Sequence, residues 1–158
     1  MMGTRRTTAV TVDEDTYETY AAELTRYAAA IAGPIDADDI VAEAFVSVLT
    51  SAKWATVEDR RAYLYRVVLN QVRDRHRARS RRERRELAAG EMSAAADLAI
   101  RPEVLAVMRS LMARQRAVLF CIYWLDLDVT STAHRLGLST RTVQREAHTA
   151  RNLMKALL

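Results

Sequence analysis

Residues 129–151 read VTSTAHRLGLSTRTVQREAHTAR, and this stretch decides the fold of the C-terminal third of the chain. The pattern predicts a helix, a tight turn and a second helix. Gly137 falls at the turn, where a left-handed backbone is cheapest for glycine, and Ser139 can cap the second helix. Ala133 is small where the two helices approach, and Val143 is an apolar plug between them. Together these residues predict a DNA-binding helix-turn-helix.

The second helix of this motif presents polar and basic side chains that suit a DNA groove. Arginine and glutamine can bond base edges in the major groove, and basic residues also contact phosphates. The alternative is an ordinary helical hairpin whose basic face is solvated. The residues expected to face DNA are Arg141, Gln144, Arg145, His148 and Arg151.

The composition is that of a small helical protein. The 158 residues include only four Gly and two Pro, which favours helix throughout. The single cysteine, Cys121, lies in the apolar run AVLFCIYWL, so we expect a buried thiol and no disulfide framework. The three His are far apart and lack ligand neighbours, so neither a metal site nor a cofactor is expected.

Charge is distributed unevenly behind a net charge of +4. Residues 1–50 carry nine acidic side chains and three Arg, whereas eight of the thirteen residues 73–85 are Arg. The Arg run indicates a phosphate partner, with a solvated helix end as the alternative. The acidic segment is expected to face a protein instead.

Other classes of function lack their signatures. No nucleophile–base pair, metal cluster or phosphate loop stands out, so we expect neither an enzyme nor a small-molecule substrate. No signal peptide or apolar run of membrane length is visible, which predicts a cytoplasmic protein without a membrane partner.

Apolar periodicity predicts three helices in the first half of the chain. The expected boundary residues are Thr11 and Glu14 at the start of the first helix, Gly33 and Pro34 at its end, Asp36 at the start of the second, and Thr56 with Asp59 at the start of the third. The apolar stripe of the second helix is Ile40, Val41, Ala44, Phe45, Val48 and Leu49. Three such stripes suffice for one small domain.

A second helical unit begins at Pro102, a residue favoured in first turns. An Ala-rich stretch without a sustained apolar stripe precedes it and predicts a flexible linker. We therefore predict an all-α fold in which two small helical domains are joined by a flexible linker. The expected segments are an N-terminal tail (1–13), a first domain (14–86), the linker (87–101) and the helix-turn-helix domain (102–158).

Three stretches, in this order, resemble the extracytoplasmic-function sigma factors, the smallest class of the bacterial sigma-70 family. DADDIVAEAFVSVL (36–49) resembles region 2.2, and RRAYLYRVVLNQVRDRHRARSRR (60–82) resembles regions 2.3 and 2.4. Residues 111–158 resemble region 4. The resemblance implies a promoter-specificity subunit that reads the −10 and −35 elements and helps to open the duplex. Its partners would be promoter DNA, core RNA polymerase through the β′ clamp helices and the β flap, and, as for many relatives, an anti-sigma factor.

The resemblance assigns polymerase binding to the exposed acidic face of the region 2.2-like helix. Asp38, Asp39 and Glu43 form that face. Where relatives often carry Gln before the Glu, this chain has Ala42. The alternative is a solvated acidic face near a helix N-terminus, which the helix dipole favours in any protein.

The resemblance also implies a pocket for a flipped base of the −10 element. Arg66 and Asn70 match the R-x-x-x-N pattern of the family, and an Asn amide offers donors and an acceptor to a base edge. Lys53 and Trp54 precede them in a loop, where Trp54 would cover or stack on the base. The alternatives are that Trp54 anchors the core and that Asn70 is a helix-surface residue. Arg73 and Arg77, with Arg75 and Arg79, would hold backbone phosphates.

In region 4, the recognition helix departs from its relatives, which often carry a run like T-V-K-S-R-L-H-R-A-R. Glu146 and Thr149 stand where Arg is usual, and Arg145 stands where Ser is usual. The resemblance assigns the −35 element to Arg141, Gln144, Arg145, His148 and Arg151. Arg145 could bond a guanine and Gln144 an adenine, while Glu146 could accept from cytosine or repel phosphate.

Two other functions remain open. A stand-alone helix-turn-helix regulator would explain residues 102–158, but such regulators usually bind as dimers, and no dimerisation helix is visible. A sigma-like decoy would bind polymerase or an anti-sigma factor without reading promoters, and the altered recognition helix leaves it possible.

Overall fold

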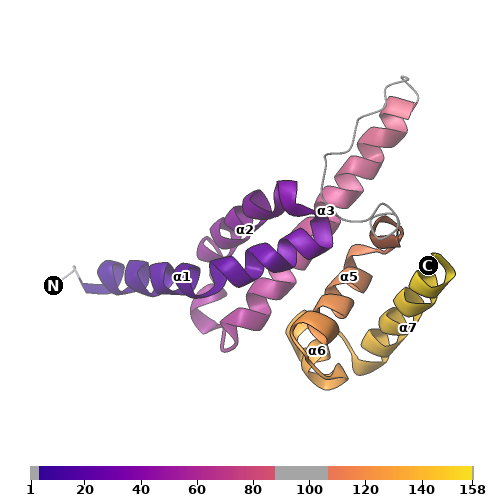
Figure 1. The fold of residues 1–158 in the computed structure, drawn as a ribbon. Helices are drawn as coiled ribbons and strands as arrows, with labels where there is room; N and C mark the ends of the chain where they lie inside the picture. The colour runs from indigo at the N-terminus through magenta and orange to yellow at the C-terminus, as the bar shows by residue number, and fades with distance from the viewer. Residues whose placement is uncertain (1–3, 88–106, 158) are drawn as a thin grey trace.

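The computed structural model describes residues 4–87 and 107–157, and every regular element among them is helical (Figure 1). The first unit comprises α1 (Thr4–Ala32), α2 (Pro34–Leu49), the 3₁₀ turn η1 (Trp54–Thr56) and α3 (Arg60–Leu87). The second comprises α5 (Ala113–Leu119), the π-helical turn η2 (Phe120–Trp124), α6 (Val129–Leu136) and α7 (Thr140–Leu157). The predicted all-α fold is confirmed. Residues 88–101 of the expected linker lie outside the described residues.

Two helix boundaries differ from those predicted. The first helix begins at Thr4, so that helix replaces the tail expected over 4–13, because no Gly or Pro interrupts the chain between Thr4 and Gly33. Gly33, with φ 93°, turns the chain between α1 and α2, and Pro34 starts α2. Asp36 therefore lies inside the first turn of α2 rather than at its cap.

The second and third helices pack largely as the sequence predicts. The side chain of Asp59 accepts a hydrogen bond from the backbone N–H of Ala62 at 2.9 Å and so caps α3. Leu49 departs from the prediction, because its side chain is 45% exposed while the neighbouring Val48 faces the core. One residue further along a helix turns a side chain by about 100°.

The helix-turn-helix forms as predicted. Gly137 ends α6 with φ 65°, and Leu138 donates its backbone N–H to the carbonyl of Ala133. Ser139 Oγ accepts from the N–H of Thr142 at 3.1 Å and caps α7. Val143 is fully buried between the two helices.

The two units share one hydrophobic core. Tyr27 of α1 packs against Tyr65 of α3 at 4.4 Å between ring centroids, and against Phe120 of η2 at 5.4 Å. Cys121 is buried beside them, as predicted. In Figure 1 the second unit lies beside the first rather than apart from it. The two predicted domains are therefore in direct contact.

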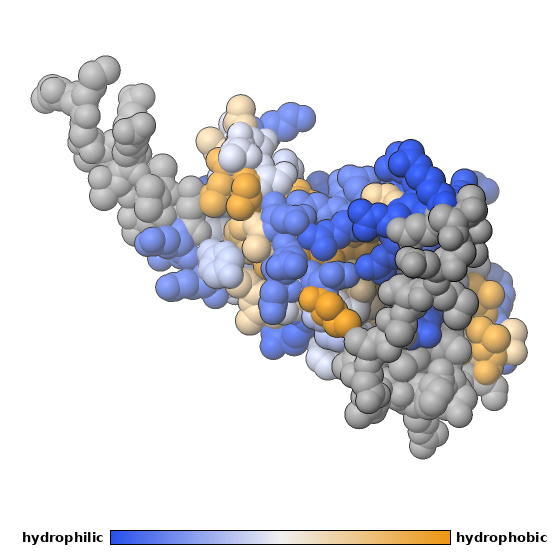
Figure 2. Space-filling view, turned by 90° about the horizontal axis from the view of Figure 1, so that it is seen from above, coloured by the Kyte–Doolittle hydropathy of each residue, from blue (hydrophilic) through white to orange (hydrophobic). Residues whose placement is uncertain are grey.

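The outer surface is mostly polar. Seen from above, hydrophilic side chains cover most of the described face, and hydrophobic groups form small separate patches (Figure 2). Within residues 4–87 and 107–157, no helix has the length and apolar character needed to cross a membrane.

Candidate nucleic-acid interface

The predicted −10 residues of α3 occupy different environments. Asn70 is exposed, whereas Arg66, one turn earlier, is half-buried. Arg66 Nη2 donates to the backbone carbonyl of His134, in the last turn of α6, at 2.7 Å. Its Nε is buried without a hydrogen-bond partner. The structure thus leaves Asn70 accessible and engages Arg66 with the second unit.

The two predicted residues of the loop before α3, Lys53 and Trp54, lie in different environments. Lys53 is exposed, but Trp54 is only 6% exposed and belongs to the hydrophobic core. The Trp54 ring packs near Tyr63, and the guanidinium of Arg60 lies 4.8 Å from the Trp54 ring centroid. Trp54 therefore matches the core-anchor alternative in this conformation.

The Arg run forms a basic surface along the C-terminal half of α3. Burial lowers the pKa of the Arg73 guanidinium, and the positive charges of Arg114 and Arg77 lower it further. Arg77 is exposed, 3.9 Å from Asp74. Crowded positive charges of this kind favour binding of an anion such as a phosphate.

Acidic groups of α2 pair with part of the Arg run. Arg75 Nη2 donates to Glu43 at 2.6 Å, and this bond raises the pKa of Arg75. Arg79 contacts Asp36 at 3.4 Å. A groove of about 280 Å³ between these helices is lined by Asp36, Arg75, Ala78, Arg79 and Arg82. Glu43 is thus tied to α3, which its sequence position alone did not indicate.

The predicted polymerase face of α2 is exposed and partly apolar. Asp38 and Asp39 are exposed. Val46 and Leu49 are 62% and 45% exposed on the same helix. The sequence pattern did not indicate Val46 and placed Leu49 in the buried stripe, because a period of 3.6 puts both residues at the edge of that stripe. Exposed apolar side chains beside acidic ones are typical of protein-binding surfaces.

The five predicted residues of the recognition helix are all exposed. They are Arg141, Gln144, Arg145, His148 and Arg151, and they lie on the faces of α7 that the buried Val143, Ala147 and Ala150 leave free. His148 pairs with Asn152 at 2.9 Å. Arg151 Nε donates to the hydroxyl of Tyr123, an exposed residue of η2, at 2.9 Å. Tyr123 is a neighbour of this face that the sequence did not reveal.

Glu146, the acidic residue that stands where relatives usually have Arg, packs against other parts of the same chain. Its side chain is only 13% exposed. Its carboxylate lies 4.0 Å from Arg114 of α5 and 3.3 Å from Arg145. This placement gives Glu146 an intramolecular role that neither sequence alternative, contact with cytosine or repulsion of phosphate, included.

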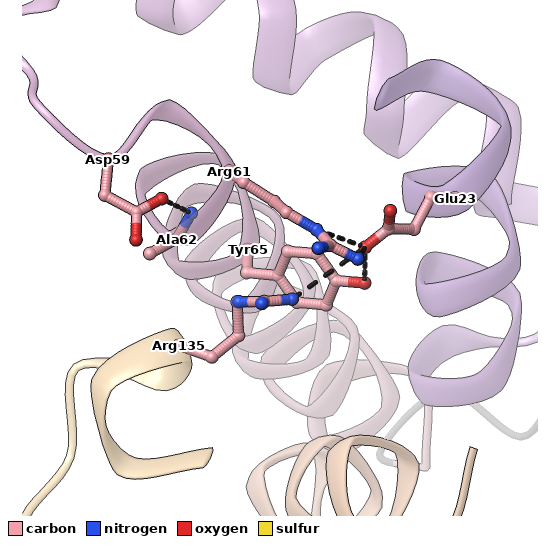
Figure 3. Close-up of polar contacts among 6 residues, drawn as sticks. All are labelled: Glu23, Asp59, Arg61, Ala62, Tyr65 and Arg135. Carbon is pink, nitrogen blue, oxygen red and sulfur yellow. Dashed lines mark hydrogen bonds and ion pairs between the residues drawn. The ribbon is translucent and has the colours of Figure 1, made fainter. Parts of the chain in front are cut away.

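A network of charges joins the two units (Figure 3). Glu23 of α1 accepts from Arg61 Nε and Nη2 at 2.9 and 2.7 Å, and from the hydroxyl of Tyr65 at 2.5 Å. Arg135 of α6 approaches the same carboxylate oxygen at 3.9 Å and lies over the Tyr65 ring at 5.1 Å. Burial, and then the bond to Glu23, raise the pKa of Tyr65. Glu23 therefore links α1, α3 and α6.

Two further contacts cross between the units. His134 Nε2 lies 2.9 Å from Asp59 Oδ2 at the start of α3. Arg116 Nη1 donates to the carbonyl of Ile31, at the end of α1, at 2.9 Å. Among the described residues, no group of three or more His, Cys, Asp or Glu side chains is placed to hold a metal ion.

Known proteins resemble this chain in sequence and in fold. The family model described as Sigma-70 region 2 matches residues 16–82. The RNA polymerase sigma-E factors of Streptomyces coelicolor and Streptomyces avermitilis are 33% and 30% identical over 123 residues, 74% of this chain and 68% of each relative.

Two solved structures share the fold over most of the chain. One is the sigma factor RpoE in complex with the anti-sigma factor NepR from Bartonella quintana, with a TM-score of 0.69, 18% identity, and coverage of 91% of this chain and 94% of that one. The other is CnrH in complex with the cytosolic domain of CnrY, with a TM-score of 0.62, 25% identity, and coverage of 92% and 86%. The chain therefore belongs to the extracytoplasmic-function class of the sigma-70 family.

Proposed function

We propose that this chain directs core RNA polymerase to specific promoters, reading the −10 element with α3 and the −35 element with α7, and that it helps to open the duplex. The observation that carries the proposal is the recognition helix. Arg141 and Arg145 are exposed on a helix whose opposite face, with Val143, is buried and whose start is fixed by Gly137 and Ser139. A rigid helix with an outward basic face suits a major groove.

The surface of α3 supports a second DNA contact. Asn70 is exposed, and the crowded guanidinium groups of Arg73 and Arg77 follow on the same helix. An amide reads a base edge, while guanidinium groups hold phosphates and add affinity without sequence preference. These two kinds of contact suit a site that binds one flipped base and also binds the phosphates of the strand beside it.

Opening the duplex needs a source of free energy, and the sequence contains no nucleotide-binding GxxxxGK[ST] loop. Base capture must therefore offset the lost stacking, about a few kcal/mol per disrupted step. A small module can supply this at one or two positions only, which favours stringent promoters.

The acidic and apolar face of α2 supports binding of a protein. Asp38 and Asp39 are exposed together with Val46 and Leu49. Core RNA polymerase is the proposed occupant, since the sequence relatives are RNA polymerase sigma factors. An anti-sigma factor is a second proposed partner, because the solved RpoE structure is a complex with one.

Run-off transcription tests the proposal. Purified core polymerase, this chain and a pool of genomic promoter fragments should yield discrete transcripts that depend on the chain. Arg145→Ala should shift the set of promoters used, and Asn70→Ala should abolish permanganate-reactive bases at the −10 element. Arg26→Ala, which removes an exposed charge from α1, is the matched control and should change neither.

The alternatives give different results in the same assay. DNA binding by the chain alone, without any transcript, would replace the proposal with the stand-alone regulator. Polymerase binding with neither transcripts nor promoter binding would replace it with the decoy.

A further inference from the structure

We propose that Glu146 is a positioning residue for recognition of the −35 element. Its carboxylate holds the guanidinium of Arg145 in the orientation that reads a base, and so sets the base preference at one position of the element. This inference deepens the proposed function and rests on it. The side chain of Glu146 is 13% exposed, whereas that of Arg145 is 66% exposed, so the first acts through the second rather than on DNA.

Glu146 and Arg145 lie where the buried and the exposed faces of α7 meet. Successive residues of a helix are turned by about 100°. Val143 and Ala147 face the core, so Glu146 lies beside this buried face and Arg145 lies one step further outward. At this position the carboxylate reaches the guanidinium of Arg145 from the protein side.

One carboxylate oxygen lies between two guanidinium groups. Glu146 Oε1 accepts from Arg145 Nη2 at 3.3 Å and lies 4.0 Å from Arg114 Nη1. Arg114 belongs to α5, a separate helix that packs against α7. The position of the carboxylate is therefore fixed by the packing of two helices, and Arg145 is held by a group that is itself held.

A fixed guanidinium reads a base better than a freely rotating one. An arginine side chain has many rotamers, and ordering it on binding costs free energy. A guanidinium carries five N–H donors, and the bond to Glu146 uses one hydrogen of Nη2. The remaining donors suffice for the O6 and N7 atoms of a guanine. Glu146 thus orders Arg145 before DNA arrives and leaves its base-reading donors available.

The negative charge of Glu146 gives the proposal a distinctive signature. A carboxylate on a DNA-binding helix weakens the attraction to phosphates, whatever the sequence of the DNA. Glu146 should therefore lower the affinity for DNA in general while it raises the preference for one base. A residue that only packed α7 against α5 would change binding to all sequences alike.

The test measures base preference with the assembled enzyme. Core polymerase carrying the full chain selects from promoters, found by run-off transcription, that are randomised through the −35 element, and sequencing gives the preference at each position. Arg145→Ala identifies the position that Arg145 reads, as the one where the preference is lost. Glu146→Ala should lower the preference at this same position about three- to tenfold, as expected for one lost hydrogen bond. Glu18→Ala, which removes an exposed carboxylate from α1, is the matched control and should leave all preferences unchanged.

Affinity for a promoter with a disfavoured base at that position supplies the second readout. Glu146→Ala should bind this promoter roughly two- to fivefold more tightly than the wild type at low salt, because one negative charge near the phosphates is removed. Weaker binding to every sequence by the same factor would show that Glu146 only packs α7, and would overturn the proposal.

The double variant Arg145→Ala/Glu146→Ala establishes whether Glu146 acts through Arg145. It should show the same base preferences as Arg145→Ala alone. A further change at that position would mean that Glu146 itself contacts the base, which contradicts a positioning role. Circular dichroism establishes that each variant is folded. If Glu146→Ala is unfolded, Glu146→Gln decides instead, and it should lower the preference about two- to threefold, because a neutral acceptor binds a guanidinium more weakly than a carboxylate does.

Failure of the inference differs from failure of the proposed function. If the wild-type enzyme selects no promoter sequence, the proposed function is refuted and the role of Glu146 with it. If the selected −35 sequence depends on Arg145 but not on Glu146, or does not depend on Arg145 at all, the positioning role alone is refuted.

Discussion

Asp59 joins two parts of the molecule through two different oxygens. Oδ1 accepts from the backbone N–H of Ala62 and starts α3, while Oδ2 meets His134 of α6. The bond from Ala62 lowers the pKa of Asp59 from its ordinary value of 3.8, and His134 lowers it further. The ionised carboxylate is therefore the form that the fold prefers.

This preference makes a pH prediction. Because the pKa of Asp59 is lower in the folded state, its stabilisation is fully present above pH 3.8 and is lost as the pH falls through the lower folded value. Urea midpoints of the wild type and Asp59→Asn should differ most near neutral pH and converge in acid. A difference that stays constant down to the acid limit would contradict the role of the charge.

Of the two glycines that the structure describes, Gly137 should be the less replaceable for contact between the units. Gly137→Ala must hold φ 65° with a side chain and displace Arg66, which should cost about 1–2 kcal/mol in urea unfolding. Gly33→Ala is the control, because its φ of 93° also strains an Ala but its Cβ would meet nothing within 4 Å. Only Gly137→Ala should speed the reaction of the buried Cys121 thiol with 5,5′-dithiobis(2-nitrobenzoate), because Cys121 lies in the core that the two units share. Equal rates in both variants would mean that the turn at Gly137 does not contribute to the contact between the units.

The start of α7 depends on one hydroxyl. Ser139→Ala removes the bond from Oγ to the N–H of Thr142 and should destabilise the protein by about 1 kcal/mol. Ser139→Asp keeps an acceptor at the same place and should retain wild-type stability. Urea unfolding followed by circular dichroism measures both. Equal losses in the two variants would show that the cap is not the cause.

Local features of the helices were predictable, because each depends on neighbours within a few residues. The left-handed Gly137, the cap at Ser139 and the plug at Val143 are of this kind. The start of α1 was not predictable, since the Thr11–Glu14 pattern is compatible with a helix interior as well as with a cap. The prediction that Asp36 caps α2 was wrong, because Gly33 and Pro34 already form the turn and start the helix two residues earlier.

Contacts between distant elements had no signal in the sequence. Glu146 reaches Arg114, and Glu23 reaches Arg135, across more than thirty residues of chain. A charged residue on a helix surface has the same periodicity whether it faces solvent, DNA or another helix. The candidate DNA residues were therefore identifiable by type and spacing, but the engagement of Arg66 and the burial of Trp54 were not.

The shared core makes the described units one cooperative body. Trp54 lies in the first unit and Trp124 in the second, so Trp124→Phe leaves a fluorescent probe of the first unit alone. In this background, fluorescence and circular dichroism should report the same urea transition. Adding His134→Ala/Arg135→Ala should separate the two transitions, because the second unit loses its charged contacts. Two transitions already present without those substitutions would contradict a shared core.

Asp59 both caps α3 and contacts His134, and this has a consequence for sequence variation among close relatives. Position 59 is exposed to solvent, and exposed positions usually tolerate many residues. Ser or Thr would cap α3 with a single oxygen and could not also hold His134, while the longer Glu is a poor cap. Relatives that keep the contact between the units should therefore vary as little at this surface position as they do in the core.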